Sequence, residues 1–127
     1  MQSPNKLRVF SEAEELALRV YELVRTLPGD ERYGLGLQMR RAAVSVGSNI
    51  AEGCGRGSGN RELLRYLSIA LGSATELEFQ LRLAHRLGYV GGQAHTLAAE
   101  HTQRVQRMLT RLIMKLRPAL EASRGRP

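Results

Sequence analysis

The chain has 127 residues, of which 43% are hydrophobic and 24% charged, with a formal net charge of +7. This length suits one domain spanning residues 1–127, and this composition excludes a wholly disordered chain. A transmembrane helix needs about 20 mostly apolar residues, and the sequence has no such run. The first six residues contain no apolar segment typical of a secretory signal. We therefore expect one globular domain with no membrane association.

Cys54 is the single cysteine, so it cannot form a disulfide within the chain. The presence of a single cysteine favours a reducing, cytoplasmic setting. The alternative is a reactive thiol or a bridge between two chains.

Positive charge is concentrated near the end of the chain. Residues 101–127 carry seven basic side chains and one acidic side chain, whereas residues 1–100 carry 12 and 11. Arginine outnumbers lysine by 17 to 2, and its planar guanidinium binds phosphate through two hydrogen bonds. This pattern favours a polyanionic partner such as nucleic acid; the alternative is an ordinary basic surface.

Apolar residues at helical spacing predict four helices. Ser11 and Glu14 have the spacing of a capping box and predict a helix over 11–27, which Pro28 ends. The second helix is expected over 34–52, the third over 59–87 with Ser58 or Asn60 as its cap, and the fourth over 93–116. Residues 118–127, beginning at Pro118, are expected to be a frayed tail.

Each expected helix has a main apolar side. In the first, it consists of Ala13, Leu16, Ala17, Val20, Leu23, Val24 and Leu27; in the second, of Leu35, Met39, Ala42, Ala43, Val46 and Ile50. In the third, it consists of Leu63, Leu67, Ala70, Ala74, Leu77, Leu81 and Ala84; in the fourth, of Ala94, Leu97, Val105, Met108, Leu109, Leu112 and Leu116. No segment alternates with the period of a strand. The expected fold is an all-α, antiparallel up-down four-helix bundle.

The third helix has a second apolar side, formed by Ile69, Phe79, Leu83 and Leu87. A helix of a monomeric bundle needs only one buried stripe. The second stripe favours self-association or a protein partner over the alternative, a wide core.

Catalytic motifs are missing from the sequence. The glycine-rich segment at 53–59 matches no nucleotide-binding motif, and no Glu is followed three positions later by the His of a di-iron bundle site. No nucleophile elbow is present, and nothing supports a thiol dyad at Cys54 beyond the presence of three histidines. We expect no enzyme activity, no metal and no cofactor.

Polar residues share one flank of the second and third helices: Arg41, Ser45, Ser48, Asn49 and Glu52, then Ser73, Glu76 and Gln80. A carboxylate near a bundle seam must be paired or hydrogen-bonded, and Arg41 and Arg56 are the candidate partners. We interpret this flank as a structural network; a catalytic acid/base pair is the alternative.

The fourth helix carries a basic stripe at steps of three or four residues. Its members Arg104, Arg107, Arg111 and Lys115, followed by Arg117, are the predicted nucleic-acid-binding residues, with no acidic residue between Glu100 and Glu121. Such a stripe can follow a phosphate backbone. Aromatic residues are scarce there, which disfavours recognition of single strands by base stacking.

Two sequence segments resemble one known family. Residues 38–53 read QMRRAAVSVGSNIAEG, Arg56 follows, and residues 70–78 read ALGSATELE. They are similar to the bacterial four-helix-bundle family encoded by intervening sequences within large-subunit ribosomal RNA genes, over roughly residues 10–115. The family's signature positions fall on Arg41, Ser45, Asn49, Glu52, Gly53, Arg56, Ser73 and Glu76. Cys54 departs from the family, which more often has an aromatic residue there.

The resemblance implies a four-helix bundle that assembles into a ring-like homopentamer with no enzymatic activity. A more distant similarity is to the accessory protein of diversity-generating retroelements, a basic pentamer that binds nucleic acid. The function we expect is an oligomeric bundle that binds RNA or DNA through its arginine-rich surface. The alternative is a structural adaptor whose oligomer docks a protein partner.

Overall fold

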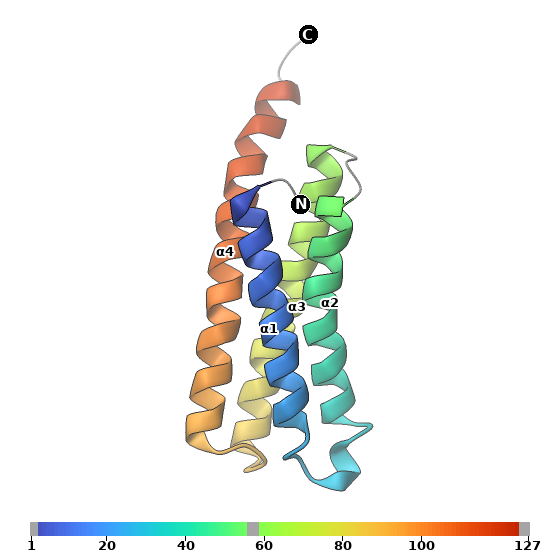
Figure 1. Ribbon diagram of the computed structural model, residues 1–127, viewed down its shortest axis with the longest axis vertical. Coiled ribbons are helices and arrows are strands. Elements are labelled where there is room, and N and C mark those ends of the chain that lie inside the picture. Colours follow the sequence, from blue (N-terminus) through green and yellow to red (C-terminus); the bar gives the residue numbers. More distant parts are fainter. Residues whose placement is uncertain (1–2, 56–58, 125–127) are drawn as a thin grey trace.

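Four helices make up the fold in the computed structural model, which describes the backbone of residues 3–55 and 59–124 and the side chains as far as residue 122. They are α1 (Pro4–Val24), α2 (Leu35–Gly55), α3 (Asn60–Arg86) and α4 (Gly92–Arg124), with a short 3₁₀ turn η1 (Gly29–Glu31) before α2. The helices lie side by side, and each helix begins at the end of the bundle where the preceding helix stops (Figure 1). No strand occurs in the described ranges, so the prediction of an all-α fold with four helices is confirmed. None of the described helices is long and apolar enough to cross a membrane.

Helix α1 begins seven residues earlier than the capping box predicted, at Pro4 rather than Ser11. Proline is favoured in the first turn of a helix because its fixed φ suits the helix and its missing N–H has no partner there anyway. Val9 is fully buried and extends the apolar side of the helix toward the N-terminus. This burial stabilises the added turns, whereas Ser11 is an exposed residue inside the helix.

Helix α4 also differs from the prediction, because it continues through Pro118 to Arg124 instead of ending in a frayed tail. Pro118 has no N–H to donate to the carbonyl of Met114. Met114 is exposed, so water can reach this part of the helix. Beyond the proline, Leu120 remains partly buried and extends the apolar side of α4. Residues 125–127 of the predicted tail lie outside the described residues.

The predicted apolar sides of α2 and α3 form most of the core. Every predicted core residue of α3 is buried, as are five of the six predicted in α2. The prediction for α4 is partly wrong: Ala94 and Leu97 are exposed, while Ala98 and Thr102 are buried. The Thr102 hydroxyl donates to the Ala98 carbonyl at 2.7 Å, which satisfies the polar group and lets threonine occupy a core position.

The turn between α3 and α4 is closed by two histidines. His85 Nδ1 lies 2.9 Å from the Val90 carbonyl oxygen, and its ring stacks on that of His95 with centroids 4.7 Å apart. Gly88 takes a φ of +79°, which permits the tight turn. Burial, together with the neighbouring His85, lowers the pKa of His95. The neutral ring of His95 therefore packs in this turn at pH 7.

Helices α2 and α3 approach each other closely at Gly53. A Cβ atom at this position would lie 2.9 Å from Tyr66 Cβ and 3.2 Å from Leu63 Cδ1. Small residues also line the buried sides of both helices, with Ala42 and Ala43 on α2 and Ala70 and Ala74 on α3. Their short side chains allow the two backbones to pack at short range.

Replacing Gly53 with alanine should therefore destabilise the fold. The added methyl group overpacks the contact with Tyr66, so we expect the free energy of unfolding to fall by about 1–3 kcal/mol. The matched control is Gly72→Ala on α3, where a Cβ would meet nothing within 4 Å. It should raise stability by up to about 1 kcal/mol, since alanine favours the helix over glycine. Urea unfolding followed by circular dichroism measures both changes; equal effects of the two substitutions would contradict the close approach.

Candidate nucleic-acid interface

The five predicted cations of α4 are all on the surface. Arg104, Arg107, Arg111, Lys115 and Arg117 are exposed. These cations have different neighbours, because α1 lies against one side of α4 and α3 against the other. Their contacts decide which of them are available to a ligand.

Arg111 and Lys115 lie on the rim of a hollow between α4 and the first turns of α1. The hollow has a volume of about 320 Å³, and its third cation is Arg8 of α1. Met108 and Leu112 contribute apolar surface to its wall, and no carboxylate is among the lining residues that the structure describes. Three cations without a carboxylate among them form a surface suited to phosphate.

Sequence reasoning missed Arg8. Its neighbours Arg111 and Lys115 are more than 100 positions away in the chain, so spacing along one helix could not bring the three together. The early start of α1 at Pro4 is what makes Arg8 part of a helix. Identifying Arg8 from the sequence would have required a correct prediction of that start and of the pairing of α1 with α4.

Arg107 and Arg111 line a second hollow, of about 500 Å³, on the α3 side of α4. Glu78 of α3 also lines it. The two carboxylate oxygens of Glu78 accept hydrogen bonds from Gln103 Nε2 at 3.0 Å and Gln106 Nε2 at 3.4 Å. These amides tie α3 to α4 and occupy the Glu78 carboxylate, so Arg107 forms no ion pair with it.

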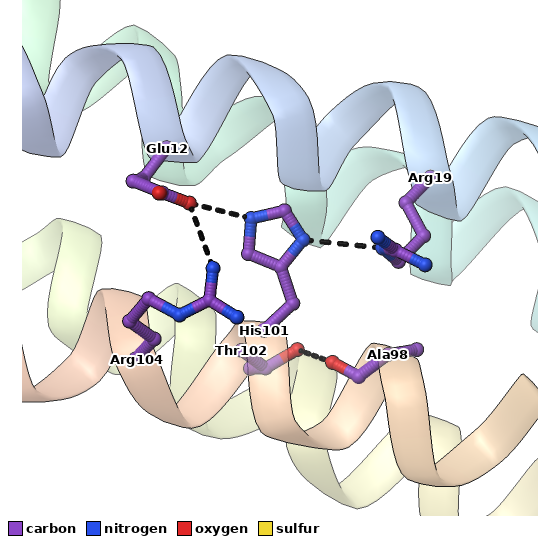
Figure 2. Close-up of polar contacts among 6 residues, drawn as sticks. All are labelled: Glu12, Arg19, Ala98, His101, Thr102 and Arg104. Atoms are coloured by element: carbon purple, nitrogen blue, oxygen red, sulfur yellow. Dashed lines mark hydrogen bonds and ion pairs between the residues drawn. The ribbon is translucent and has the colours of Figure 1, made fainter.

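Arg104 differs from the other cations because it forms an ion pair. Its Nη1 lies 3.4 Å from Glu12 Oε2 on α1, and His101 Nε2 lies 2.9 Å from the same oxygen. On the other side of the His101 ring, Arg19 Nε donates to Nδ1 at 3.2 Å. Figure 2 shows this cluster between α1 and α4. The charge of Arg104 is therefore partly neutralised, which makes it the weakest candidate for phosphate contact.

The His101 ring is 5% exposed, so its hydrogen bonds matter for stability. Because Arg19 donates to Nδ1, the ring proton lies on Nε2 and is donated to Glu12. Sequence reasoning missed this cluster as well, since its α1 and α4 members are more than 80 positions apart. It is a structural connection between the two helices.

The signature residues of α2 and α3 divide into separate contacts. The hydroxyls of Ser45 and Ser73 lie 2.8 Å apart, and Asn49 Nδ2 donates to the Ser45 carbonyl at 2.8 Å and to its hydroxyl at 3.1 Å. Glu76 accepts a hydrogen bond from Gln80 Nε2 at 3.1 Å.

The remaining signature positions show no catalytic arrangement in the described part of the chain. Arg41 and Glu52 are exposed, no ion pair joins Arg41 to Glu76, and Gly53 is buried at the helix contact. Arg56 lies outside the described residues. Among the signature residues, the hydrogen bond between Ser45 and Ser73 joins α2 to α3, and the structural network stays a prediction.

Cys54 is half-buried, and burial raises the pKa of its thiol, with Lys6 opposing that effect. The thiol therefore stays protonated at neutral pH, which disfavours nucleophilic reactivity. Within residues 3–55 and 59–124, no three His, Cys, Asp or Glu side chains gather as a set that could hold a metal ion.

Comparison with known proteins places the chain in a family. The profile described as 23S rRNA-intervening sequence protein matches residues 5–111. The chain belongs to this family. Among proteins of curated function, none matches the chain. The further similarity to the retroelement accessory protein stays a prediction.

The family fold is also seen in a crystal structure. The bundle is similar to a protein of unknown function from the S23 ribosomal protein family of Bacteroides thetaiotaomicron VPI-5482. The TM-score is 0.80 over 87% of this chain and 98% of that chain, at 23% sequence identity. At this identity the likeness establishes the fold alone.

Removing the Glu12 carboxylate should weaken the connection between α1 and α4. In Glu12→Ala the buried His101 Nε2–H loses its acceptor, and we expect a loss of about 1–3 kcal/mol in the free energy of unfolding. Glu14→Ala is the matched control on the same helix, because Glu14 is exposed, and it should change stability by less than about 0.5 kcal/mol. Urea unfolding tests the pair; a Glu12 variant as stable as the control would show that the cluster contributes nothing.

Proposed function

We propose that this protein is a non-enzymatic, cytoplasmic homo-oligomer that binds RNA through the cations of α4 and the start of α1. The observation that carries the proposal is the convergence of Arg8, Arg111 and Lys115 on one hollow whose described lining residues include no carboxylate. The excess of basic residues after position 100 supports it. The name of the family, which refers to 23S rRNA, supports RNA over DNA.

The proposed contact is to the phosphate backbone rather than to particular bases. Arg107, Arg111 and Lys115 are exposed along α4 at steps of four residues, with Arg8 beside them. Guanidinium and ammonium groups neutralise phosphates and release counterions, which gives affinity without sequence preference. Arg104 contributes less because Glu12 already accepts its hydrogen bond.

We also propose that the antiparallel bundles assemble into a homopentamer, as the family resemblance implies. The second apolar stripe of α3 supports association, since Ile69, Phe79, Leu83 and Leu87 are all exposed, Phe79 by 63%. A ring of identical chains would present several copies of the cationic surface to one RNA molecule. Simultaneous contacts of this kind raise overall affinity well above that of a single site.

Reversing the charges in the α1–α4 hollow should abolish most RNA binding. We expect the variant Arg8→Glu, Arg111→Glu, Lys115→Glu to bind a structured RNA at least about 100-fold more weakly, because three phosphate contacts are lost. Fluorescence anisotropy at fixed salt measures the affinity. The control changes Arg41, Arg61 and Arg65 to Glu, which alters the net charge equally but on exposed positions of α2 and α3.

The control variant should retain most of the affinity. An equal loss in both variants would mean that overall charge, and not this hollow, governs binding. If the unmodified oligomer binds no RNA and instead retains one protein stoichiometrically after nuclease treatment, the adaptor function is the correct one.

Oligomerisation should depend on the exposed apolar stripe of α3. Burying each large apolar side chain contributes about 1.5–3 kcal/mol to an interface. The double substitution Phe79→Ser, Leu83→Ser should therefore convert the oligomer to monomers, as measured by size-exclusion chromatography with light scattering. Leu18→Ser, on α1, is the control and should keep the oligomer, although Leu18 is also exposed by 58%. Unmodified protein that runs as a monomer would contradict the pentamer.

A further inference from the structure

A separate hollow lies at the opposite end of the bundle, where α1 turns into α2. It has a volume of about 530 Å³ and is lined by residues of α1, η1 and α2. Three arginines contribute to it, Arg25, Arg32 and Arg40, together with two of the four tyrosines of the chain, Tyr21 and Tyr33. In Figure 1 this turn lies at the lower end, whereas α4 ends at the upper end. The hollow is therefore distinct from the surface formed by Arg8, Arg111 and Lys115.

The guanidinium group of Arg40 is held in place before any ligand arrives. Its Nη2 donates to the Arg32 carbonyl at 3.1 Å. Arg40 is half-buried. Its remaining N–H groups are available beside the exposed guanidinium of Arg32.

The charge balance of the hollow is positive. None of the described residues that line it carries a carboxylate. Glu22 lies 3.9 Å from Arg25, but both side chains are at least three-quarters exposed, so this pair is weak and screened. Glu31 is directed elsewhere, since its Oε1 accepts from the backbone N–H of Leu35 at 3.2 Å. The hollow is thus suited to an anion.

The same hollow also offers surfaces for a flat ring. Tyr33 is 76% exposed, and the guanidinium carbon of Arg32 lies 5.5 Å from the centroid of its ring. Val24 and Leu27 add apolar surface beside Tyr21. Arginine binds phosphate through paired hydrogen bonds, and nucleobases stack on aromatic side chains. Pockets that hold small ligands have volumes of about 300–1,000 Å³.

We propose that this hollow binds one nucleotide, with its phosphate on Arg32 and Arg40 and its base against Tyr33. A free mononucleotide and the 5′-phosphorylated end of an RNA strand carry the same chemistry. The site is independent of the phosphate contacts proposed for α4, because it shares no residue with them.

Isothermal titration calorimetry on the full chain tests the proposal with AMP, inorganic phosphate, and a short oligoribonucleotide carrying either a 5′-phosphate or a 5′-hydroxyl. Arg32→Gln should weaken nucleotide binding at least about tenfold, as expected for loss of hydrogen bonds to a charged group. Tyr33→Ala should weaken it about fivefold or more through lost stacking, whereas Tyr33→Phe should retain it. Arg61→Gln removes the same charge from an exposed position on α3 and is the control.

Binding of AMP, together with a preference for the 5′-phosphorylated over the 5′-hydroxyl strand, would assign the site to any nucleotide, and the same preference without AMP binding would assign it to an RNA end. Three results would overturn the proposal: no AMP binding together with equal affinities for the two strands, equal affinities for AMP and inorganic phosphate, or Arg32→Gln and Tyr33→Ala variants that bind like the control. Circular dichroism confirms that each variant is folded. Because the α4 cations are untouched, failure here leaves the proposed RNA surface standing.

Discussion

Gly53 lies where α2 and α3 come so close that even a methyl group would have to displace Tyr66. About two helical turns from Gly53 along the same seam, the hydroxyls of Ser45 and Ser73 are 2.8 Å apart. Serine side chains are short, so this hydrogen bond also requires the two backbones to lie near one another. Both helices also bury alanines in the core. The tight α2–α3 pair is the part of the fold on which the other helices pack.

This constraint explains the polar residues that mark the family. The hydroxyls of Ser45 and Ser73 are hydrogen-bonded across the seam, Asn49 bonds to Ser45 within α2, and Gln80 bonds to Glu76 within α3. The bond across the seam fixes the position of one helix against the other. These structural contacts involve several of the polar residues in the recognisable strings of α2 and α3.

Helices α1 and α4 meet through a different kind of contact. Glu12, Arg19, His101 and Arg104 form a polar cluster across this seam, with His101 almost fully enclosed. The pairing of α1 with α4 has two consequences for charge: it neutralises part of Arg104, and it places Arg8 beside Arg111 and Lys115. The cations that bind the helices together are thus distinct from those that remain available to a polyanion.

The fold was largely predictable from the sequence because the apolar period is regular in α2 and α3. The start of α1 and the end of α4 were not, because the local signals at Ser11 and Pro118 predicted shorter helices, whereas Val9 extends the buried side of α1 and α4 continues through Pro118. The cations Arg107, Arg111 and Lys115 could be predicted from their spacing on one helix, and they are exposed. Arg8, the Glu12–His101 cluster and the pocket beside Tyr33 depend on which helices lie next to one another, and spacing within one segment does not contain that information.

The most direct test of the central claim is the salt dependence of RNA binding by the unmodified protein, after its size in solution has been measured. If Arg8, Arg107, Arg111 and Lys115 of one chain each neutralise a phosphate, the slope of log K against log salt concentration should be about −3 to −4, and steeper if several chains engage. A matched DNA duplex measured in the same way shows whether RNA is preferred. A slope near zero, or no binding at low salt, would contradict the claim that this surface binds nucleic acid.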